Sequence, residues 1–88
     1  MNTKQVIIIR SDLKMRRGKE VAQGSHASMA FLTKRLVDKS FSEIELRDEE
    51  KEWMLSSFKK ITCRAESLEE LLEIAKKAEL AGLEVNII

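Results

Sequence analysis

The stretch Val6-Ile-Ile-Ile-Arg-Ser-Asp-Leu-Lys-Met-Arg-Arg-Gly-Lys-Glu-Val-Ala-Gln-Gly-Ser-His-Ala-Ser28 decides the fold, because an apolar run leads through a basic turn into a helical pattern. The run Val6–Ile9 is continuously apolar and β-branched, which predicts a strand buried on both faces. Residues 11–18 are predicted to form a connection, and Gly18 to open a helix. Backbone N–H groups at a helix start lack partners within the helix and carry a partial positive charge. The region is therefore predicted to bind an anion such as phosphate.

The turn holds the candidate phosphate-binding residues, which are Lys14, Arg16, Arg17 and Lys19. Their cluster lies in a connection rather than along a helix, so a solvated helix face does not explain it well. Residues 1–36 hold eight cations and two anions, a net charge of +6, while residues 37–88 hold eight cations and thirteen anions, a net charge of −5. This uneven distribution suits a phosphate-rich partner better than a membrane. No Walker or dinucleotide-binding fingerprint is present.

The first helix, predicted from Lys19 to about Val37, carries the candidate catalytic residues. With Lys19 at the origin of a helical wheel, Gln23 lies at about 40° and His26 at about 340°. These three residues form a polar strip whose successive members are neighbours. The strip can hold a phosphate or carbonyl at the helix start and offer a proton acceptor further along. Beside it runs the predicted buried stripe, flanked by Val21, with the members Ala22, Ser25, Met29, Leu32 and Leu36.

Other interpretations of this helix remain open. His26 would be structural if its ring were half-buried and hydrogen-bonded to a carbonyl. Ser25 and His26 suggest a nucleophile and a base, but adjacent helical residues point about 100° apart, which argues against such a pair. Gly24 costs roughly 1 kcal/mol relative to Ala in a helix interior. Close approach of another backbone or of a ligand would explain a glycine at this position. It would also be explained if the helix simply tolerates the small loss of stability.

The middle of the chain is predicted to contain a loop and a short helix. Residues 38–47 have mixed polarity and form the loop, while residues 48–57 begin with three acidic residues that favour a helix N-terminus. Trp53, Met54 and Phe58 are interpreted as core anchors rather than as platforms for base stacking.

The last third of the chain is predicted to form a strand, a helix and another strand. In residues 61–65 apolar and polar side chains alternate with the period of a strand. Ser67 and Glu70 form a capping box for a helix that ends near Gly82. The residues that this helix is predicted to bury are Leu68, Leu71, Leu72, Ala75 and Ala78. Residues 83–88 are predicted to be a third strand. Two β–helix–β crossovers predict an α/β fold with largely parallel pairing, in a single domain over residues 1–88.

Several classes of protein are excluded by composition. Cys63 is the only cysteine, so no internal disulfide can form, and one Cys with one His cannot supply a four-ligand zinc site. The N-terminus lacks a secretory apolar region, and no run reaches the length of a membrane span. These features predict a soluble, cytoplasmic protein.

Two segments carry a resemblance to a known family. They are the run from Gln5 to Met15 and the string Gly18-Lys19-x-x-Ala22-Gln23-x-Ser25-His26-Ala27. Together they closely resemble the archaeal and eukaryotic type of peptidyl-tRNA hydrolase. Later pieces are similar to that family too, namely Lys60-Ile61, the Ser67 to Leu71 helix start and Ala81-Gly82-Leu83. The resemblance covers nearly the whole chain.

The resemblance implies a dimeric, three-layer α/β/α sandwich that hydrolyses the ester between a peptide and the terminal ribose of tRNA, without a metal or other cofactor. The family's lysine, glutamine and histidine correspond to Lys19, Gln23 and His26. Departures are Arg16 where Gly is common, Glu20 where an apolar residue is usual, and Gly24 where Cys or Ala is frequent. The family also continues with an Asp-x-Gly-x-Thr loop and a last strand, which supply a catalytic aspartate and threonine. Residues 1–88 contain no such loop, so the resemblance implies a C-terminally incomplete domain.

Three functional hypotheses follow. In the first, Lys19, helped by Arg16 and Arg17, holds tRNA phosphate or stabilises the carbonyl oxygen, Gln23 orients the ester or a water, and His26 accepts the water's proton. The aspartate of the further loop would share or take over that base role. In the second, the chain is a non-catalytic tRNA- or RNA-binding module, although it lacks the interleaved aromatic and basic residues of single-strand binders. In the third, it is an inactive fragment of the hydrolase, whose open sheet edge would favour dimerisation or aggregation.

Overall fold

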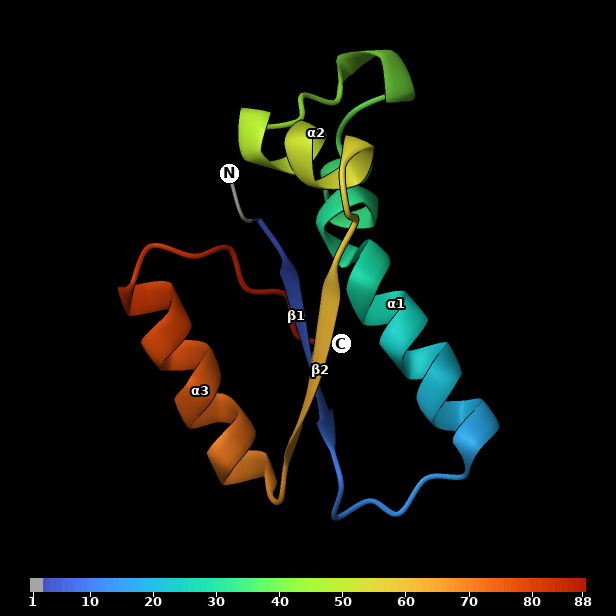
Figure 1. The fold of residues 1–88 in the computed structure, drawn as a ribbon, viewed down its shortest axis with the longest axis vertical. Helices are drawn as coiled ribbons and strands as arrows, with labels where there is room; N and C mark the ends of the chain where they lie inside the picture. Colours follow the sequence, from blue (N-terminus) through green and yellow to red (C-terminus); the bar gives the residue numbers. More distant parts are fainter. Residues whose placement is uncertain (1–2) are drawn as a thin grey trace.

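Figure 1 shows two strands side by side between two long helices, in a computed structural model that describes residues 3–88. Helix α1 lies on one side of the strands and α3 on the other, so the architecture has three layers. A third helix, α2, lies at one end of the sheet. The elements are, in chain order, β1 (Gln5–Arg10), α1 (Arg17–Arg35), the 3-10 turn η1 (Phe41–Glu43), α2 (Asp48–Leu55), β2 (Lys60–Ala65) and α3 (Leu68–Leu80). The predicted α/β class is confirmed.

The two strands form a parallel pair whose register runs from Gln5 opposite Lys60 to Arg10 opposite Ala65. The Gln5 side chain is hydrogen-bonded to the backbone and hydroxyl oxygens of Ser28 in α1, at 2.9 and 2.6 Å. Because side chains alternate along a strand, the odd-numbered residues of β1 face α1 and the even-numbered residues face α3. The same register places the even-numbered residues of β2 on the α1 side.

The predicted third strand is wrong for the residues that the structure describes. Residues 83–88 return from α3 toward the strands (Figure 1). Within residues 3–88, however, the sheet consists of β1 and β2, and residues 84–88 make no backbone–backbone hydrogen bond. An apolar run favours extended backbone, yet it becomes a strand only with a neighbour about 4.8 Å away. Here β1 and residues 83–88 line a common groove of about 950 Å³, which we call the β1 groove.

The predicted buried stripe of α1 is also wrong. Met29 is 51% exposed and Val21 64%, whereas Ala30 is fully buried and Phe31 nearly so. The predicted members Ala22 and Ser25 are exposed, and Leu32 and Leu36 are half-buried. On the helical wheel, Ala30 and Phe31 lie roughly opposite the predicted stripe. The side of α1 that faces the sheet is therefore the one with small residues and Phe31. Phe31 packs edge-to-face on Trp53, with ring centroids 6.1 Å apart.

Trp53 anchors the α2 end of the core, as predicted. Its side chain is 5% exposed, and its indole N–H donates to the carbonyl of Lys59 at 2.6 Å. The Phe58 ring packs against it at a tilt of 49°, with ring centroids 4.6 Å apart, but Phe58 remains 46% exposed, and Met54 is half-buried. A ring enclosed in this way is unavailable for base stacking.

Burial of β1 and α3 is shallower than predicted. In β1 only Ile7 is buried, and Val6 is 51% exposed, because two strands and their helices do not enclose both faces. In α3 only Ala75 is buried, while Leu68 and Leu72 are each 47% exposed, so most of the predicted core stripe lies at the surface or the edge of the β1 groove. Leu71 and Ala78 are half-buried.

The caps of α3 follow the predicted positions. Ser67 is the N-cap, and its hydroxyl accepts a hydrogen bond from the Glu70 N–H at 3.0 Å. The Glu70 carboxylate accepts from the N–H of Glu66 rather than of Ser67, at 3.2 Å, so the box is shifted by one residue on that side. The helix ends at Leu80, and Gly82 follows its C-cap with a φ of +83° that suits glycine. The Leu83 N–H donates to the carbonyl of Ala78 in a Schellman motif.

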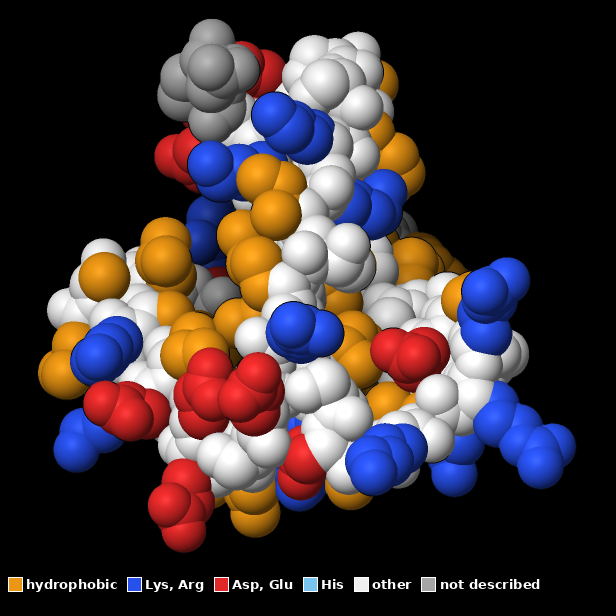
Figure 2. Space-filling model, turned by 60° about the horizontal axis from the view of Figure 1, so that its bottom comes forward, with side chains coloured by type: hydrophobic (Ala, Val, Ile, Leu, Met, Phe, Trp, Pro, Cys, Tyr) orange, Lys and Arg blue, Asp and Glu red, His pale blue; other side chains and the backbone are white. Residues whose placement is uncertain are grey.

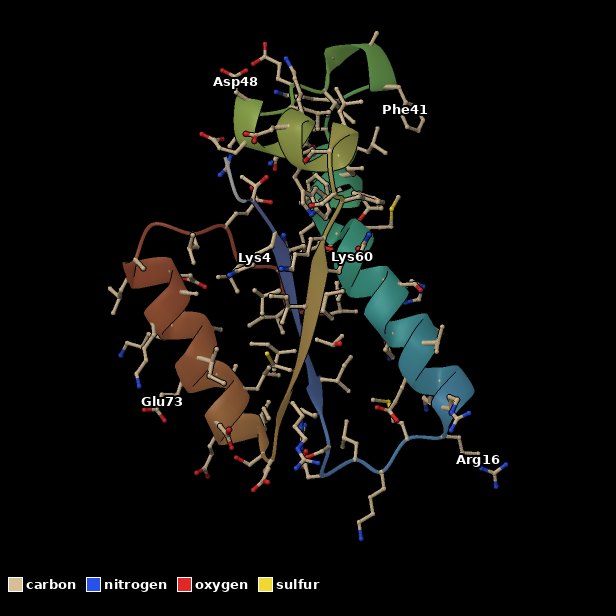
Figure 3. All side chains as sticks on the ribbon, viewed as in Figure 1. Lys4, Arg16, Phe41, Asp48, Lys60 and Glu73 are labelled. Carbon is tan, nitrogen blue, oxygen red and sulfur yellow. The ribbon has the colours of Figure 1, made fainter. Side chains whose placement is uncertain are left out.

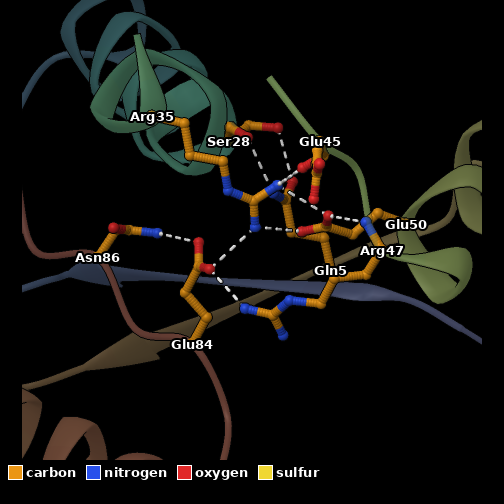
Figure 4. A network of polar contacts seen from close by, with 8 residues as sticks. All are labelled: Gln5, Ser28, Arg35, Glu45, Arg47, Glu50, Glu84 and Asn86. Atoms are coloured by element: carbon orange, nitrogen blue, oxygen red, sulfur yellow. Dashed lines mark hydrogen bonds and ion pairs between the residues drawn. The ribbon is translucent and has the colours of Figure 1, made fainter. Parts of the chain in front are cut away.

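A charged network joins α1, α2 and the C-terminal segment (Figure 4). The Arg35 guanidinium donates two hydrogen bonds of 2.8 Å to Glu50 and one of 2.9 Å to Glu84. Arg47 donates to Glu84 at 2.6 Å, and Arg35 also lies over the ring of Phe31, 5.4 Å from its centroid. The network holds three segments that are distant in the sequence.

Acid is expected to destabilise the fold through this network. Hydrogen bonds from Arg35 lower the pKa of Glu50. Burial acts to raise the pKa of Glu84, but hydrogen bonds from Arg35 and Asn86 outweigh burial and leave this pKa lowered. A carboxyl with a lowered folded pKa stabilises the fold above its unfolded value of about 4.3, and this contribution is lost as pH falls through the folded value. We therefore expect the free energy of unfolding to be level above about pH 5 and to fall below about pH 4.5.

Urea titrations between pH 3 and pH 7 measure this effect. Arg35→Gln should flatten the acid side of the profile and lower the plateau. Lys77→Gln is the matched control, because its ion pair with Glu73 is 3.5 Å long and fully at the surface, where such pairs contribute little. Equal acid loss in wild type and Arg35→Gln would contradict the assignment.

Candidate active site

The basic turn leads into an uncapped helix N-terminus. Arg16 is the N-cap of α1 with extended backbone, and its side chain makes no capping hydrogen bond. It projects away from the body of the protein at the start of the helix (Figure 3). Because no side chain caps the first turn, its N–H groups and the positive end of the helix dipole are available to an anion.

The basic side chains around this terminus are exposed. Lys14, Arg16, Arg17 and Lys19 are all at the surface, and none makes an ion pair or side-chain hydrogen bond within residues 3–88. In Figure 2 basic side chains prevail toward the start of α1, and acidic ones prevail toward the start of α3. The charge asymmetry of the sequence is therefore also visible on this face of the molecule.

The three candidate catalytic residues follow one side of α1. Lys19 and His26 are exposed and Gln23 is half-buried, because Gln23 lies at the margin of the side that faces the sheet. Gln23 lines the β1 groove together with Ala27. Seven helical residues rise about 10 Å, so Lys19 and His26 can contact different parts of one ligand with Gln23 between them. The strip has an ammonium, an amide and an imidazole open to solvent or to a groove.

The structure contradicts the structural interpretation of His26 and leaves simple tolerance as the interpretation of Gly24 within the chain. The His26 ring is exposed and makes no hydrogen bond within the described part of the chain, so it is not a half-buried structural histidine. The Ser25 hydroxyl donates to the carbonyl of Val21 at 2.8 Å, as an ordinary helical serine does. A β-carbon on Gly24 would lie 3.9 Å from Ile9, an ordinary contact, so close packing within the chain does not demand glycine there.

Lys14 lies apart from the strip, in a second groove that the sequence did not reveal. This β2 groove, of about 650 Å³, lies between α1 and β2. Its lining includes Lys14, Thr62 and Arg64, of which only Lys14 was a candidate. The alternation of residues 61–65 showed that Thr62 and Arg64 share a face, but only the pairing register shows that this is the α1 side.

Comparison with known proteins gives the family. The family model described as peptidyl-tRNA hydrolase PTH2 matches residues 3–88. The chain belongs to the peptidyl-tRNA hydrolase PTH2 family. Peptidyl-tRNA hydrolase of Methanothermobacter thermautotrophicus is 44% identical over 80 residues, covering 91% of this chain and 62% of the relative. That of Saccharolobus solfataricus is 39% identical over 87 residues, covering 97% of this chain and 68% of the relative.

Members of the PTH2 family similar to this chain also occur in eukaryotes. The mitochondrial peptidyl-tRNA hydrolase 2 of Bos taurus is 33% identical over 87 residues, covering 97% of this chain and 44% of the relative. No solved structure matches the chain significantly. The chain spans 62–68% of the length of the archaeal relatives that it matches. In residues 3–88 no helix combines the length and apolar character that crossing a bilayer requires.

Proposed function

We propose that the protein hydrolyses the ester bond of peptidyl-tRNA and releases a peptide and free tRNA. The observation that carries this proposal is the strip of Lys19, Gln23 and His26, open to solvent or to a groove beside an uncapped and basic helix terminus. Membership of the PTH2 family supports the same reaction. The substrate combines a phosphate-rich RNA with a carbonyl group, and this site offers groups for both.

In the proposed mechanism the basic terminus binds tRNA phosphates and the strip acts on the ester. Lys19, helped by Arg16 and Arg17, holds a phosphate or stabilises the negative charge that develops on the carbonyl oxygen. Gln23 orients the ester or the attacking water through its amide. His26 accepts the proton of that water as its oxygen bonds to the carbonyl carbon. The bond from this carbon to the ribose oxygen then breaks, and the proton passes to the ribose oxygen.

Further features of the proposal concern the setting of the enzyme. We propose that it acts in the cytoplasm as a homodimer without a metal or other cofactor. The family resemblance supports the dimer and the cofactor-free reaction. The many exposed large apolar side chains, among them Val37 at 77% and Leu80 at 79% exposure, are compatible with a self-association surface.

Release of an N-acylated amino acid from its tRNA tests the proposal. We expect the chain to produce free tRNA, and His26→Ala to lower the rate by about 10²-fold or more, as for loss of a general base. Ser25→Ala is the matched control on the adjacent residue, since its hydroxyl is occupied by the Val21 carbonyl. Its rate should equal that of wild type.

The outcomes separate the open hypotheses. Binding of tRNA without ester cleavage would support an RNA-binding module in place of the enzyme. If the chain neither binds tRNA nor cleaves the ester, it is an inactive fragment. Equal rates for His26→Ala and wild type would remove the imidazole from the mechanism.

A further inference from the structure

The β2 groove exists because α1 covers only half of its side of the sheet. Helix α1 packs against β1 and not against β2. Thr62 and Arg64 are on the α1 side of β2, yet both are exposed. One wall of the groove is therefore this uncovered strand face, and the other is α1 with the turn that precedes it.

The lining of the groove is part apolar and part polar. Apolar residues and a glycine contribute to it, namely Ile9, Met15, Val21 and Gly24. The polar side chains on the α1 side of the lining are Ser11, Lys14, Glu20, Thr62 and Arg64. A single phosphate would fill only a small part of about 650 Å³, which is in the range of sites for whole small molecules.

Two of the cations that line the groove are available to a ligand. The third, Arg10, lies on the α3 side of β1 by the strand alternation and is paired with Asp12 at 2.6 Å. Lys14 and Arg64 make no ion pair or side-chain hydrogen bond with any residue between 3 and 88. Lys14 also has a φ of +49°, a left-handed conformation that is uncommon outside glycine and is a recurrent feature of ligand-binding loops.

We propose that the β2 groove holds a stretch of the tRNA sugar–phosphate backbone, with Lys14 and Arg64 pairing with its phosphates from opposite walls. This inference rests on the proposed function and extends it. RNA fits better than an isolated anion because the groove is much larger than one phosphate and has on each of its two walls a cation that is unpaired within residues 3–88. Lys14 is also continuous in sequence with the basic turn at Arg16 and Arg17.

In this arrangement two parts of the substrate contact two different sides of α1 near its start. On the helical wheel Val21 and Gly24 lie at about 200° and 140° from Lys19, so the β2 groove and the catalytic strip occupy different sides of α1. The ester would lie at the strip, while RNA more distant from the ester runs through the β2 groove. Arg64 would then contribute to binding and not to the chemical step.

Binding of deacylated tRNA at increasing salt concentrations tests this inference without requiring hydrolysis. We expect Arg64→Gln to weaken binding and to reduce the slope of log K against log salt by about 0.7 to 1, as for one lost phosphate contact. The double variant Lys14→Gln with Arg64→Gln should reduce it by about twice as much. Lys76→Gln is the matched control, because it removes the same charge from an exposed site on α3, in the opposite layer. Thermal melting checks that all variants fold.

The results distinguish this inference from the proposed function. If Arg64→Gln and Lys76→Gln bind tRNA alike, or if the wild-type chain binds no tRNA, the inference is wrong, whether or not peptidyl-tRNA is cleaved. If binding depends selectively on Arg64 but no ester is cleaved, the inference holds and the proposed function fails. Binding of 5′-AMP as tight as that of tRNA, with the same loss in Arg64→Gln, would overturn the inference in favour of a mononucleotide site.

Discussion

Replacing Trp53 with alanine is expected to lower the free energy of unfolding by about 3 to 5 kcal/mol. The side chain is 5% exposed, packs against Phe31 and Phe58, and donates to the Lys59 carbonyl. Truncation would remove the largest apolar surface of the core and leave that carbonyl without its donor. Because small domains lie near the lower end of the usual range of about 5 to 15 kcal/mol, a substantial fraction of this variant should be unfolded.

Urea unfolding followed by circular dichroism measures this loss. Trp53→Phe keeps an aromatic ring but loses the hydrogen bond, and should cost about 1 to 3 kcal/mol. Leu55→Ala is the control in the same helix, since Leu55 is 87% exposed and should change stability little. Equal midpoints for wild type and Trp53→Ala would mean that the ring cluster does not hold α1, α2 and β2 together.

Replacing Lys19 with alanine is expected to lower the rate of peptide release by about 10² to 10³-fold. Lys19 is exposed in the first turn of α1, where the amine adds its charge to that of the uncapped terminus. If the amine stabilises charge that develops only in the transition state, kcat falls with kcat/KM; if it holds ground-state phosphate, KM rises instead. Comparing kcat and KM between Lys19→Ala and wild type therefore shows whether Lys19 acts in the transition state or in substrate binding.

Lys34→Ala is the matched control for this variant. Lys34 is an exposed lysine of the same helix, but it lies in the last turn, far from the basic terminus. Its removal changes net charge equally and should leave release unchanged. A loss of rate common to both variants would indicate a general charge effect rather than a site at Lys19.

The sequence predicted the order and type of most elements because their signals are local. The β-branched run at Val6–Ile9, the acidic start of α2, the Ser67 cap and the glycine after α3 each act within a few residues, and all are found close to the expected positions. The third strand failed because pairing is not local. Residues 83–88 have the composition of a strand, but residues 84–88 make no backbone–backbone hydrogen bond with any residue between 3 and 88.

Side-chain burial was harder to predict than secondary structure. The apolar stripe with Met29 and Leu32 satisfied helical periodicity, but so did a second side with Ala27, Ala30 and Phe31, and periodicity does not choose between them. Which side of α1 is buried depends on the contact between Phe31 and Trp53, which belongs to the later helix α2. For the same reason the Arg35 network, which joins three distant segments, gave no signal in the sequence.

The candidate site was only partly accessible from the sequence. The strip of Lys19, Gln23 and His26 follows from helical spacing and therefore depends on one helix alone. Arg64 escaped notice because its approach to Lys14 depends on the register between β1 and β2. Residues that share a helix are thus predictable, whereas residues brought together by strand pairing are not.

The central claim is that Lys19 and His26 act on one substrate from one side of α1. A double-mutant cycle measured by single-turnover peptide release tests it most directly, with wild type, Lys19→Ala, His26→Ala and the double variant. Groups that act as a unit show strongly non-additive losses, so the double variant should be little slower than the slower single variant. Losses that multiply in full, or a Lys19→Ala rate equal to that of wild type, would contradict the claim.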